Sequence, residues 1–220
     1  MAFGVIPNSP PRTPHFWVVW GWGLLLGLLA IAVNAKLLVD ADHQMARWME
    51  AVRTPGRDAA AKTMTFFGGS PWTLAAVAAM SLRWWAIHRR AALWACLWAG
   101  LGGGILQCLL RLWVGQWRPD TIPPSTMDLA ARYELAGFTS GHAFRAAFLY
   151  GWWAQALLRR RTWWAATGAI GCGLLIVVVG LTRVYLGRHW VSDVAGGWLV
   201  ALTALALAKR LEVRFGGGSA

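Results

Sequence analysis

Long apolar stretches separated by short polar segments dominate the sequence. A helix that crosses a bilayer needs about 20 mostly apolar residues, and six stretches reach or approach this length. They cover residues 16–38, 71–87, 91–112, 140–158, 162–181 and 193–208. Because an open sheet would leave unpaired backbone groups in lipid, we interpret all six as helices. The pattern predicts an all-α, six-transmembrane-helix integral membrane bundle.

The whole bundle is expected to form one unit. We assign residues 1–215 to a single domain, and residues 216–220, which read Gly-Gly-Gly-Ser-Ala, to a flexible tail or leftover linker. Hydrophobic residues make up 57% of the 220 residues and charged residues only 14%, whereas soluble domains carry about a quarter charged residues. This composition excludes a disordered chain and disfavours a soluble domain.

The net charge of +12 is high for so apolar a chain, and it is unevenly distributed. On one side of the predicted bundle the connections carry ten basic residues against Glu212 alone. The positive-inside rule places this side, and both termini, in the cytoplasm. On the other side, residues 39–70 mix both signs, and we expect an amphipathic helix at the membrane interface there. The ten basic residues are Arg12, Arg83, Arg89, Arg90, Arg159, Arg160, Arg161, Lys209, Arg210 and Arg214.

Three segments on the outward-facing side carry candidate chemistry, and residues 111–119 are the first. Arg111 and Arg118 are seven apart and would share a face of a continuing helix. Gly115 and Pro119 indicate that the helix soon ends. Taken alone, two arginines at a helix end are also explained by snorkelling toward the interface.

The second segment is Phe138-Thr139-Ser140-Gly141-His142. Thr139 or Ser140 is suited to cap the fourth span, and a helix start is a ready anion site because its N–H groups are free. His142 falls in the first turn, and Arg145 follows one turn later on a similar face. An ordinary cap with an interfacial histidine would give the same pattern.

The third segment runs from Thr182 to Asp193. His189 and Asp193 are four apart, so on a helix they share a face. An aspartate bonded to one imidazole nitrogen fixes the tautomer and leaves the other nitrogen nucleophilic. Ionisable residues next to membrane spans are functional candidates by default, and Arg183 lies in the same segment.

Together the three segments favour a phosphate site. Arg111, Arg118 and Arg183 converge with a helix N-terminus, and guanidinium groups match the geometry of phosphate oxygens. A zinc site built from the two histidines and Asp193 is disfavoured, because the arginines would repel a cation. A serine hydrolase using Ser140 is disfavoured because the G-x-S-x-G elbow is absent.

These segments resemble the type 2 phosphatidic acid phosphatase superfamily, whose pattern is K-x6-R-P, then P-S-G-H, then S-R-x5-H-x3-D. The chain reads Arg111-x6-Arg118-Pro119, then Thr139-Ser140-Gly141-His142, then Thr182-Arg183-x5-His189-x3-Asp193. Arg111, Thr139 and Thr182 stand where the family has Lys, Pro and Ser. Each replacement keeps the charge, the cap or the hydroxyl, so no chemical role is deleted. The motifs cover about the C-terminal half of the chain.

The resemblance implies a phosphohydrolase that needs neither metal nor cofactor. It implies that His189 attacks phosphorus, that Asp193 orients His189, and that His142 protonates the leaving oxygen and later activates water. The phosphoryl oxygens would be bound by Arg111, Arg118, Arg183, Ser140 and the Gly141 backbone N–H. From the residues alone we add Arg145 and Arg188 as candidate contacts to the lipid headgroup.

The expected protein is a multi-pass lipid phosphatase of the bacterial inner (cell) membrane, with its site facing the periplasm or exterior. Its partners would be an amphiphilic lipid phosphate and membrane lipids, with no nucleic acid. Undecaprenyl diphosphate is the first expected substrate, with phosphatidylglycerol phosphate, phosphatidic acid and lipid A phosphate as alternatives. Lipid phosphotransfer and non-catalytic lipid binding or transport remain open, as do oligomeric state and the preference for mono- or diphosphates.

Overall fold

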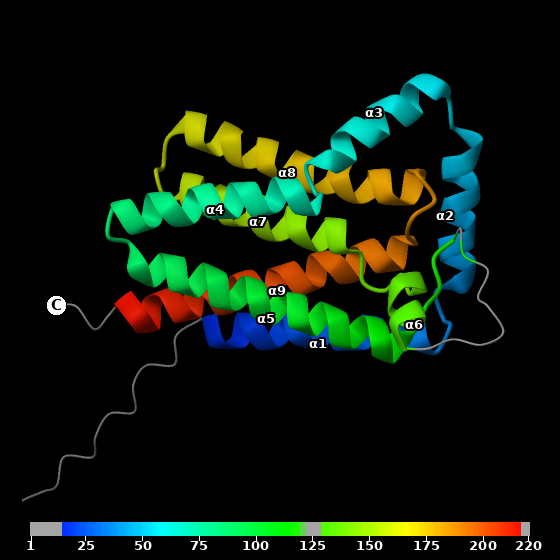
Figure 1. Cartoon of the computed structure of the whole chain (residues 1–220), viewed down its shortest axis with the longest axis horizontal. Coiled ribbons are helices and arrows are strands. Elements are labelled where there is room, and N and C mark those ends of the chain that lie inside the picture. The colour runs from blue at the N-terminus through cyan, green and yellow to red at the C-terminus, as the bar shows by residue number, and fades with distance from the viewer. Residues whose placement is uncertain (1–14, 120, 122–128, 217–220) are drawn as a thin grey trace, which may run out of the picture.

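The computed structural model describes residues 15–119, 121 and 129–216, and within these ranges the chain is helical (Figure 1). The described part contains no β-strand, only an isolated bridge between Trp117 and Ala136, so the all-α prediction is confirmed. The helices are α1 (His15–Asn34), α2 (Val39–Ala51), α3 (Pro55–Phe66), α4 (Ser70–Ala86), α5 (Arg90–Val114), α6 (Leu129–Leu135), α7 (Gly141–Leu158), α8 (Trp163–Tyr185) and α9 (Val191–Gly216).

Six helices, namely α1, α4, α5, α7, α8 and α9, run along the long axis of the bundle, and each corresponds to one predicted span (Figure 1). Four of them, α1, α5, α8 and α9, are long and apolar enough to cross a membrane by length and composition. The other two are α4, with only 17 residues, and α7, which carries His142 and Arg145. The membrane character is therefore clear, while six complete spans remain a prediction.

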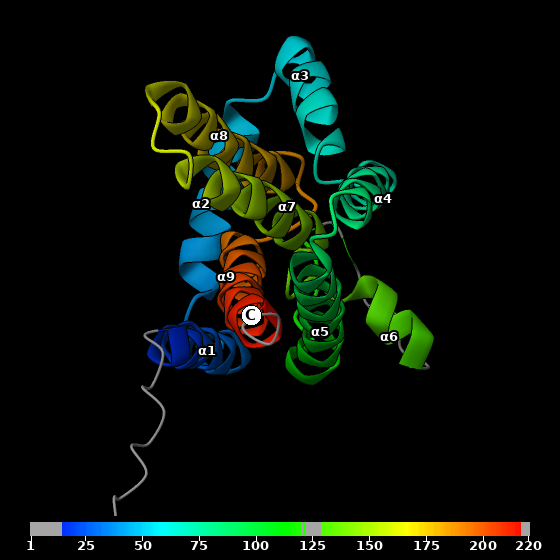
Figure 2. The same ribbon diagram turned by 90° about the vertical axis from the view of Figure 1, so that its left-hand side faces the viewer.

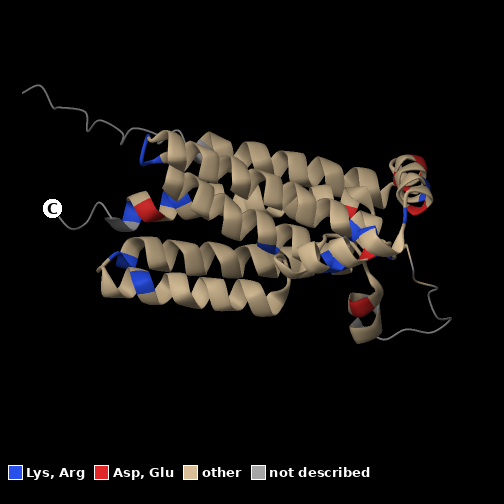
Figure 3. Ribbon diagram, turned by 90° about the horizontal axis from the view of Figure 1, so that it is seen from above, with Lys and Arg blue, Asp and Glu red and all other residues tan. Residues whose placement is uncertain are grey.

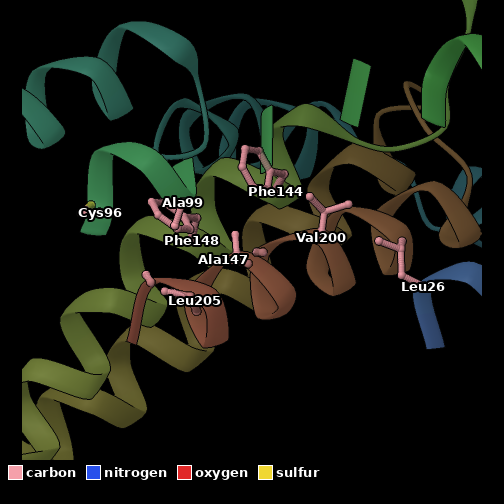
Figure 4. Packing of buried hydrophobic residues seen from close by; sticks show 11 residues of the cluster. Leu26, Cys96, Ala99, Phe144, Ala147, Phe148, Val200 and Leu205 are labelled. Carbon is pink, nitrogen blue, oxygen red and sulfur yellow. The ribbon is translucent and has the colours of Figure 1, made fainter. Parts of the chain in front are cut away.

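Helix α9 lies at the centre of the bundle and packs against α1, α5 and α7 (Figure 2). Small residues allow this close packing: a Cβ at Gly103 would lie 2.9 Å from the Phe144 ring, and one at Gly151 would lie 2.6 Å from Leu205. Small residues at helix contacts let backbones approach where van der Waals packing drives association. Figure 4 shows the resulting core. Its buried members are Leu26, Cys96, Ala99, Phe144, Ala147, Phe148, Val200, Ala201, Ala204, Leu205 and Ala208.

Residues 39–70 form two helices rather than the single amphipathic helix that we expected. Helix α2 lies across one end of the bundle and α3 continues from it at an angle (Figure 1). Pro55 causes the break, because a residue before proline is driven out of the helical region, and Thr54 is extended (φ −145°, ψ 154°). The Thr54 hydroxyl then accepts the Arg57 N–H at 3.3 Å and caps α3.

The two ends of the bundle differ in charge. Basic residues with few acidic neighbours gather at the end where the chain leaves α9, whereas both signs mix at the end with α2 (Figure 3). The basic end is the side that the positive-inside rule assigns to the cytoplasm, although Arg12 lies outside the described residues. Helix α9 ends at Gly216, and residues 217–220 of the predicted tail lie outside the described part.

Candidate active site

The first candidate segment ends α5 as its sequence indicated. Gly115 follows the helix in the left-handed conformation (φ 60°), and its N–H bonds the Arg111 carbonyl at 3.2 Å. A glycine at this position ends helices because it adopts positive φ without strain. Arg111 therefore lies in the last turn of α5, while Arg118 lies beyond the helix, where its N–H meets the Leu135 carbonyl at 3.4 Å.

The second segment begins α7, with Ser140 at the N-cap position as predicted. The expected capping bond is not formed by its side chain, and within the described part of the chain the buried Ser140 hydroxyl has no partner. The preceding Thr139 carbonyl accepts from Gln107 at 3.0 Å and from Arg111 at 3.1 Å. The start of α7 is thus fixed by α5.

His142 and Arg145 lie on one face of α7, as their spacing predicted. Arg145 Nη2 is 3.4 Å from His142 Nδ1, and Arg145 Nε donates to the Gly68 carbonyl at 3.0 Å. Gly141 leaves room for this guanidinium, because a Cβ there would lie 3.0 Å from Arg145 Nη1. Arg183 and Arg118 also lie close enough to act on the charge of the His142 ring.

The third segment brings His189 and Asp193 together, with a local geometry that differs from our expectation. Helix α9 begins at Val191, so His189 precedes the helix rather than sharing its face. His189 Nδ1 still lies 3.3 Å from Asp193 Oδ2, and the same oxygen accepts the Trp190 N–H at 2.9 Å. Because Oδ2 acts as an acceptor, Nδ1 carries the imidazole proton and Nε2 keeps a free lone pair.

Both members of this pair are buried, with His189 4% exposed and Asp193 0%. The Asp193 carbonyl accepts the Ser140 N–H at 2.9 Å, which joins the start of α9 to the start of α7. Gly197 permits this approach, because a Cβ there would lie 2.6 Å from the Ser140 carbonyl oxygen. The start of α7, which carries the predicted acid His142, is therefore bonded directly to the start of α9, which carries Asp193 and follows the predicted nucleophile His189.

Burial lowers the pKa of His189 well below its ordinary value, and the positive charges of Arg183, Arg118 and Arg111 add to this effect. All three predicted arginines thus lie close enough to act on the charge of His189, although they come from separate segments. A lowered pKa keeps the imidazole neutral near pH 7, which is the form that can attack phosphorus.

Several partners of these residues escaped the sequence analysis. Thr65 of α3 accepts a 3.1 Å hydrogen bond from Arg183, and the Gly68 carbonyl holds Arg145. Thr65 and Gly68 lie outside the three motifs and are distant from them in sequence. Gln107 could have been found, because it is a polar residue inside an apolar span, four residues before Arg111. Arg188, our other headgroup candidate, is exposed beside the buried His189.

The donor groups at the site suit an anion with several oxygens. Within the described residues, no three His, Cys, Asp or Glu side chains group closely enough to hold a metal ion. Among those residues, the buried atoms that can donate a hydrogen bond and are left without a partner include Arg111 Nε, Thr139 Oγ1 and Ser140 Oγ. Donors gathered around a nucleophile are what phosphoryl transfer requires.

A family model described as the PAP2 superfamily matches residues 91–216 of the chain. This is more than half of its length. The chain belongs to the PAP2 superfamily. The match contains all three motifs, so the resemblance to type 2 phosphatidic acid phosphatases is confirmed and the protein is a PAP2 phosphatase.

Two curated relatives support this assignment. The chain is 27% identical over 195 residues to phosphatidylglycerophosphatase B of Bacillus subtilis, covering 84% of this chain and 90% of the relative. It is also 27% identical over 214 residues to lipid A 1-phosphatase of Rhizobium etli, covering 86% of each. Both relatives span nearly the full chain and are named as lipid phosphatases.

The fold is also similar to a solved structure, the crystal structure of a transmembrane PAP2-type phosphatidylglycerolphosphate phosphatase from Bacillus subtilis. The TM-score is 0.75 at 24% sequence identity, over 90% of this chain and 97% of the other. Because the match covers 90% of this chain, the agreement extends to residues that precede residue 91.

Proposed function

We propose that this PAP2 phosphatase removes phosphate from a membrane lipid through a phosphohistidine formed on His189. The buried His189–Asp193 pair, surrounded by Arg111, Arg118 and Arg183, carries the proposal. A neutral imidazole oriented through Nδ1 presents Nε2 as a nucleophile, and the guanidinium groups stabilise charge on the equatorial oxygens of the transition state.

In the first step His189 Nε2 attacks phosphorus, and a P–N bond forms while the bond from phosphorus to the lipid oxygen breaks. The negative charge of the bound phosphate favours the protonated form of His142 against burial and the nearby arginines. His142 then donates its proton to that leaving oxygen, so the lipid departs as an alcohol, or as a monophosphate from a diphosphate. Asp193 accepts the Nδ1–H hydrogen bond and stabilises the positive charge that the imidazole gains.

In the second step water attacks phosphorus from the side that the lipid vacated. His142, now neutral, takes a proton from this water, and the P–N bond breaks to return neutral His189 and free inorganic phosphate. The Ser140 hydroxyl and the Gly141 N–H at the start of α7 assist the three arginines in binding phosphoryl oxygens in both steps.

The lipid tail is proposed to reach the site from the side. A cavity of about 360 Å³ lies among α4, α5 and α7, and its lining is apolar apart from Ser70, Thr73 and Arg145. Arg145 also contacts His142, so the apolar cavity meets the proposed acid at this residue. A tail in this groove would leave its phosphate near Arg145, with Arg188 a further candidate contact on the headgroup.

The candidate substrates are phosphatidylglycerol phosphate, lipid A phosphate, phosphatidic acid and undecaprenyl diphosphate. The names of the relatives support the first two, and they do not single out undecaprenyl diphosphate, which was our first expectation. We propose a single domain with six spans and cytoplasmic termini, in a bacterial inner membrane. The site would then face the periplasm or exterior, because the basic end lies opposite.

The proposal is tested by phosphate release from a panel of these four lipids in one detergent with EDTA present. We expect turnover by the wild type and loss of turnover in His189→Ala at unchanged expression and thermal stability. Acid-labile phosphate trapped on the wild type during turnover, and absent from His189→Ala, would identify the phosphohistidine. A fully active His189→Ala enzyme would exclude the mechanism, and lipid binding without turnover by the wild type would favour a non-catalytic role.

A further inference from the structure

A buried carboxylate outside the three motifs contacts the active-site turn. Asp42 of α2 is 4% exposed. Its Oδ1 accepts the Ser192 backbone N–H at 3.0 Å, and its Oδ2 accepts the Ser192 hydroxyl at 2.5 Å. Gln116 Nε2 lies 3.4 Å from the same Oδ2. Both carboxylate oxygens of Asp42 thus accept hydrogen bonds from Ser192 of α9.

Ser192 is directly adjacent to Asp193 and lies in the first turn of α9. N–H groups in the first turn have no partner within their own helix, and the helix dipole makes this end favourable for a negative charge. Asp42 therefore acts as a cap supplied by a distant helix. These two hydrogen bonds, one to the backbone and one to the side chain of Ser192, restrict both the position and the rotation of the first turn of α9.

The same turn is held by other contacts at its preceding residue. The Trp190 indole N–H donates to the Trp117 carbonyl at 2.7 Å, and the His43 ring lies 4.7 Å from the Trp190 ring. Asp42 and His43 are neighbours on α2, so this helix contacts two of the three residues between His189 and Asp193, namely Ser192 and Trp190. Helix α2 precedes residue 91, where the family match begins.

We propose that Asp42 is a positioning residue that holds the 189–193 turn so that His189 Nε2 is aimed at phosphorus. This inference rests on the function proposed above. Asp42 bonds the turn through Ser192, the residue next to Asp193. Its loss is therefore expected to lower the rate of attack more than the binding of phosphate oxygens.

The experiment compares four single variants with the wild type in the lipid phosphatase assay, and measures kcat, KM and the inhibition constant of inorganic phosphate. We expect Asp42→Ala to lower kcat by about 10- to 100-fold, because misplacement by about 1 Å can cost about 100-fold. KM and the phosphate inhibition constant should stay within about twofold. Asp40→Ala, an exposed aspartate on the same helix, is the matched control and should behave as the wild type.

Asp42→Asn separates hydrogen bonding from charge. The amide oxygen can accept the Ser192 N–H and the amide N–H can donate to the Ser192 hydroxyl, so kcat should recover to within about fivefold of the wild type. Ser192→Ala removes the hydroxyl bond and keeps the backbone bond, so it should lose less kcat than Asp42→Ala. If Asp42→Ala does not fold, as judged by gel filtration and thermal stability, these two variants carry the test.

The inference is overturned if Asp42→Ala keeps the wild-type kcat, if it raises KM with kcat unchanged, or if Asp42→Asn is as slow as Asp42→Ala. If Asp42→Ala misfolds, either of two results overturns the inference. One is a full wild-type kcat in Ser192→Ala, and the other is a loss of kcat above about tenfold in Asp42→Asn. A wild type without lipid phosphatase activity would instead refute the proposed function, so the two failures are distinguishable.

Discussion

The two ends of the bundle both carry many arginines, and they use them differently. At the basic end the side chains of Arg89, Arg160 and Arg161 are exposed. Arg159 forms an ion pair with Glu212 there, at 2.9 Å. At the site end Arg111 and Arg145 are partly buried, and each donates to a backbone carbonyl. The exposed arginines contribute to membrane orientation through their total charge, whereas the arginines of the site can bind a ligand because hydrogen bonds fix their positions.

The largest expected effect contrasts one arginine from each end. Arg118→Ala should lower kcat by about 10²–10³-fold, because in the proposed mechanism it removes a donor that stabilises the transition state. Arg160→Ala at the basic end should leave turnover within about twofold of the wild type, because that side chain is exposed. Steady-state phosphate release measures both variants, and equal losses would show that total charge, rather than placement, controls activity.

Packing gives the second contrast. A Cβ at Gly137 would lie 2.6 Å from Asp193 Oδ2, so Gly137→Ala should displace the carboxylate and lower kcat by at least about tenfold. Overpacking should also destabilise the protein by about 1–3 kcal/mol. Gly173→Ala in α8, where a Cβ meets nothing within 4 Å, is the control. Gly137→Ala with normal activity and melting temperature would contradict the close packing of the site.

Acid should weaken the site end through His189. Its pKa is lowered in the folded protein, so below its ordinary pKa the unfolded chain binds a proton that the native protein does not. Stability therefore falls as pH drops from about 7.5 to 5, by up to about 1.4 kcal/mol for each pH unit below that ordinary pKa. Melting temperatures should fall less steeply in His189→Gln than in the wild type, and equal slopes would contradict the prediction. His88→Gln, an exposed histidine near the basic end, should keep the wild-type slope.

The smallest effect belongs to the ion pair of the basic end. Glu212→Gln should change stability by less than about 1 kcal/mol, because Arg159 is 52% exposed and exposed ion pairs contribute little. Thermal unfolding at low and high salt measures the change. A loss of several kcal/mol, or any loss of kcat, would show that the basic end is organised in the same way as the site.

The sequence predicted those features that depend on residues close together in the chain. Apolar runs placed all six long helices, Gly115 marked the end of α5, and the motif spacings identified the residues that meet around His189. Features that depend on distant contacts were missed. Asp42 binds a residue 150 positions away, and Thr65 binds one 118 positions away, and no local pattern marks either. Ser140 is at the predicted N-cap position, but its side chain makes no capping bond and within the described residues its hydroxyl has no hydrogen-bond partner.

The hydrogen bond from the Ser140 N–H to the Asp193 carbonyl has a mechanical consequence. It ties the helix that carries His142 to the helix that carries Asp193 at the level of the reaction, so the two helices tilt together when the bilayer becomes thinner or thicker. We therefore expect the separation of nucleophile and acid to be insensitive to lipid chain length. Vesicles of different acyl length should change how readily a substrate reaches the enzyme more than how fast a bound one reacts.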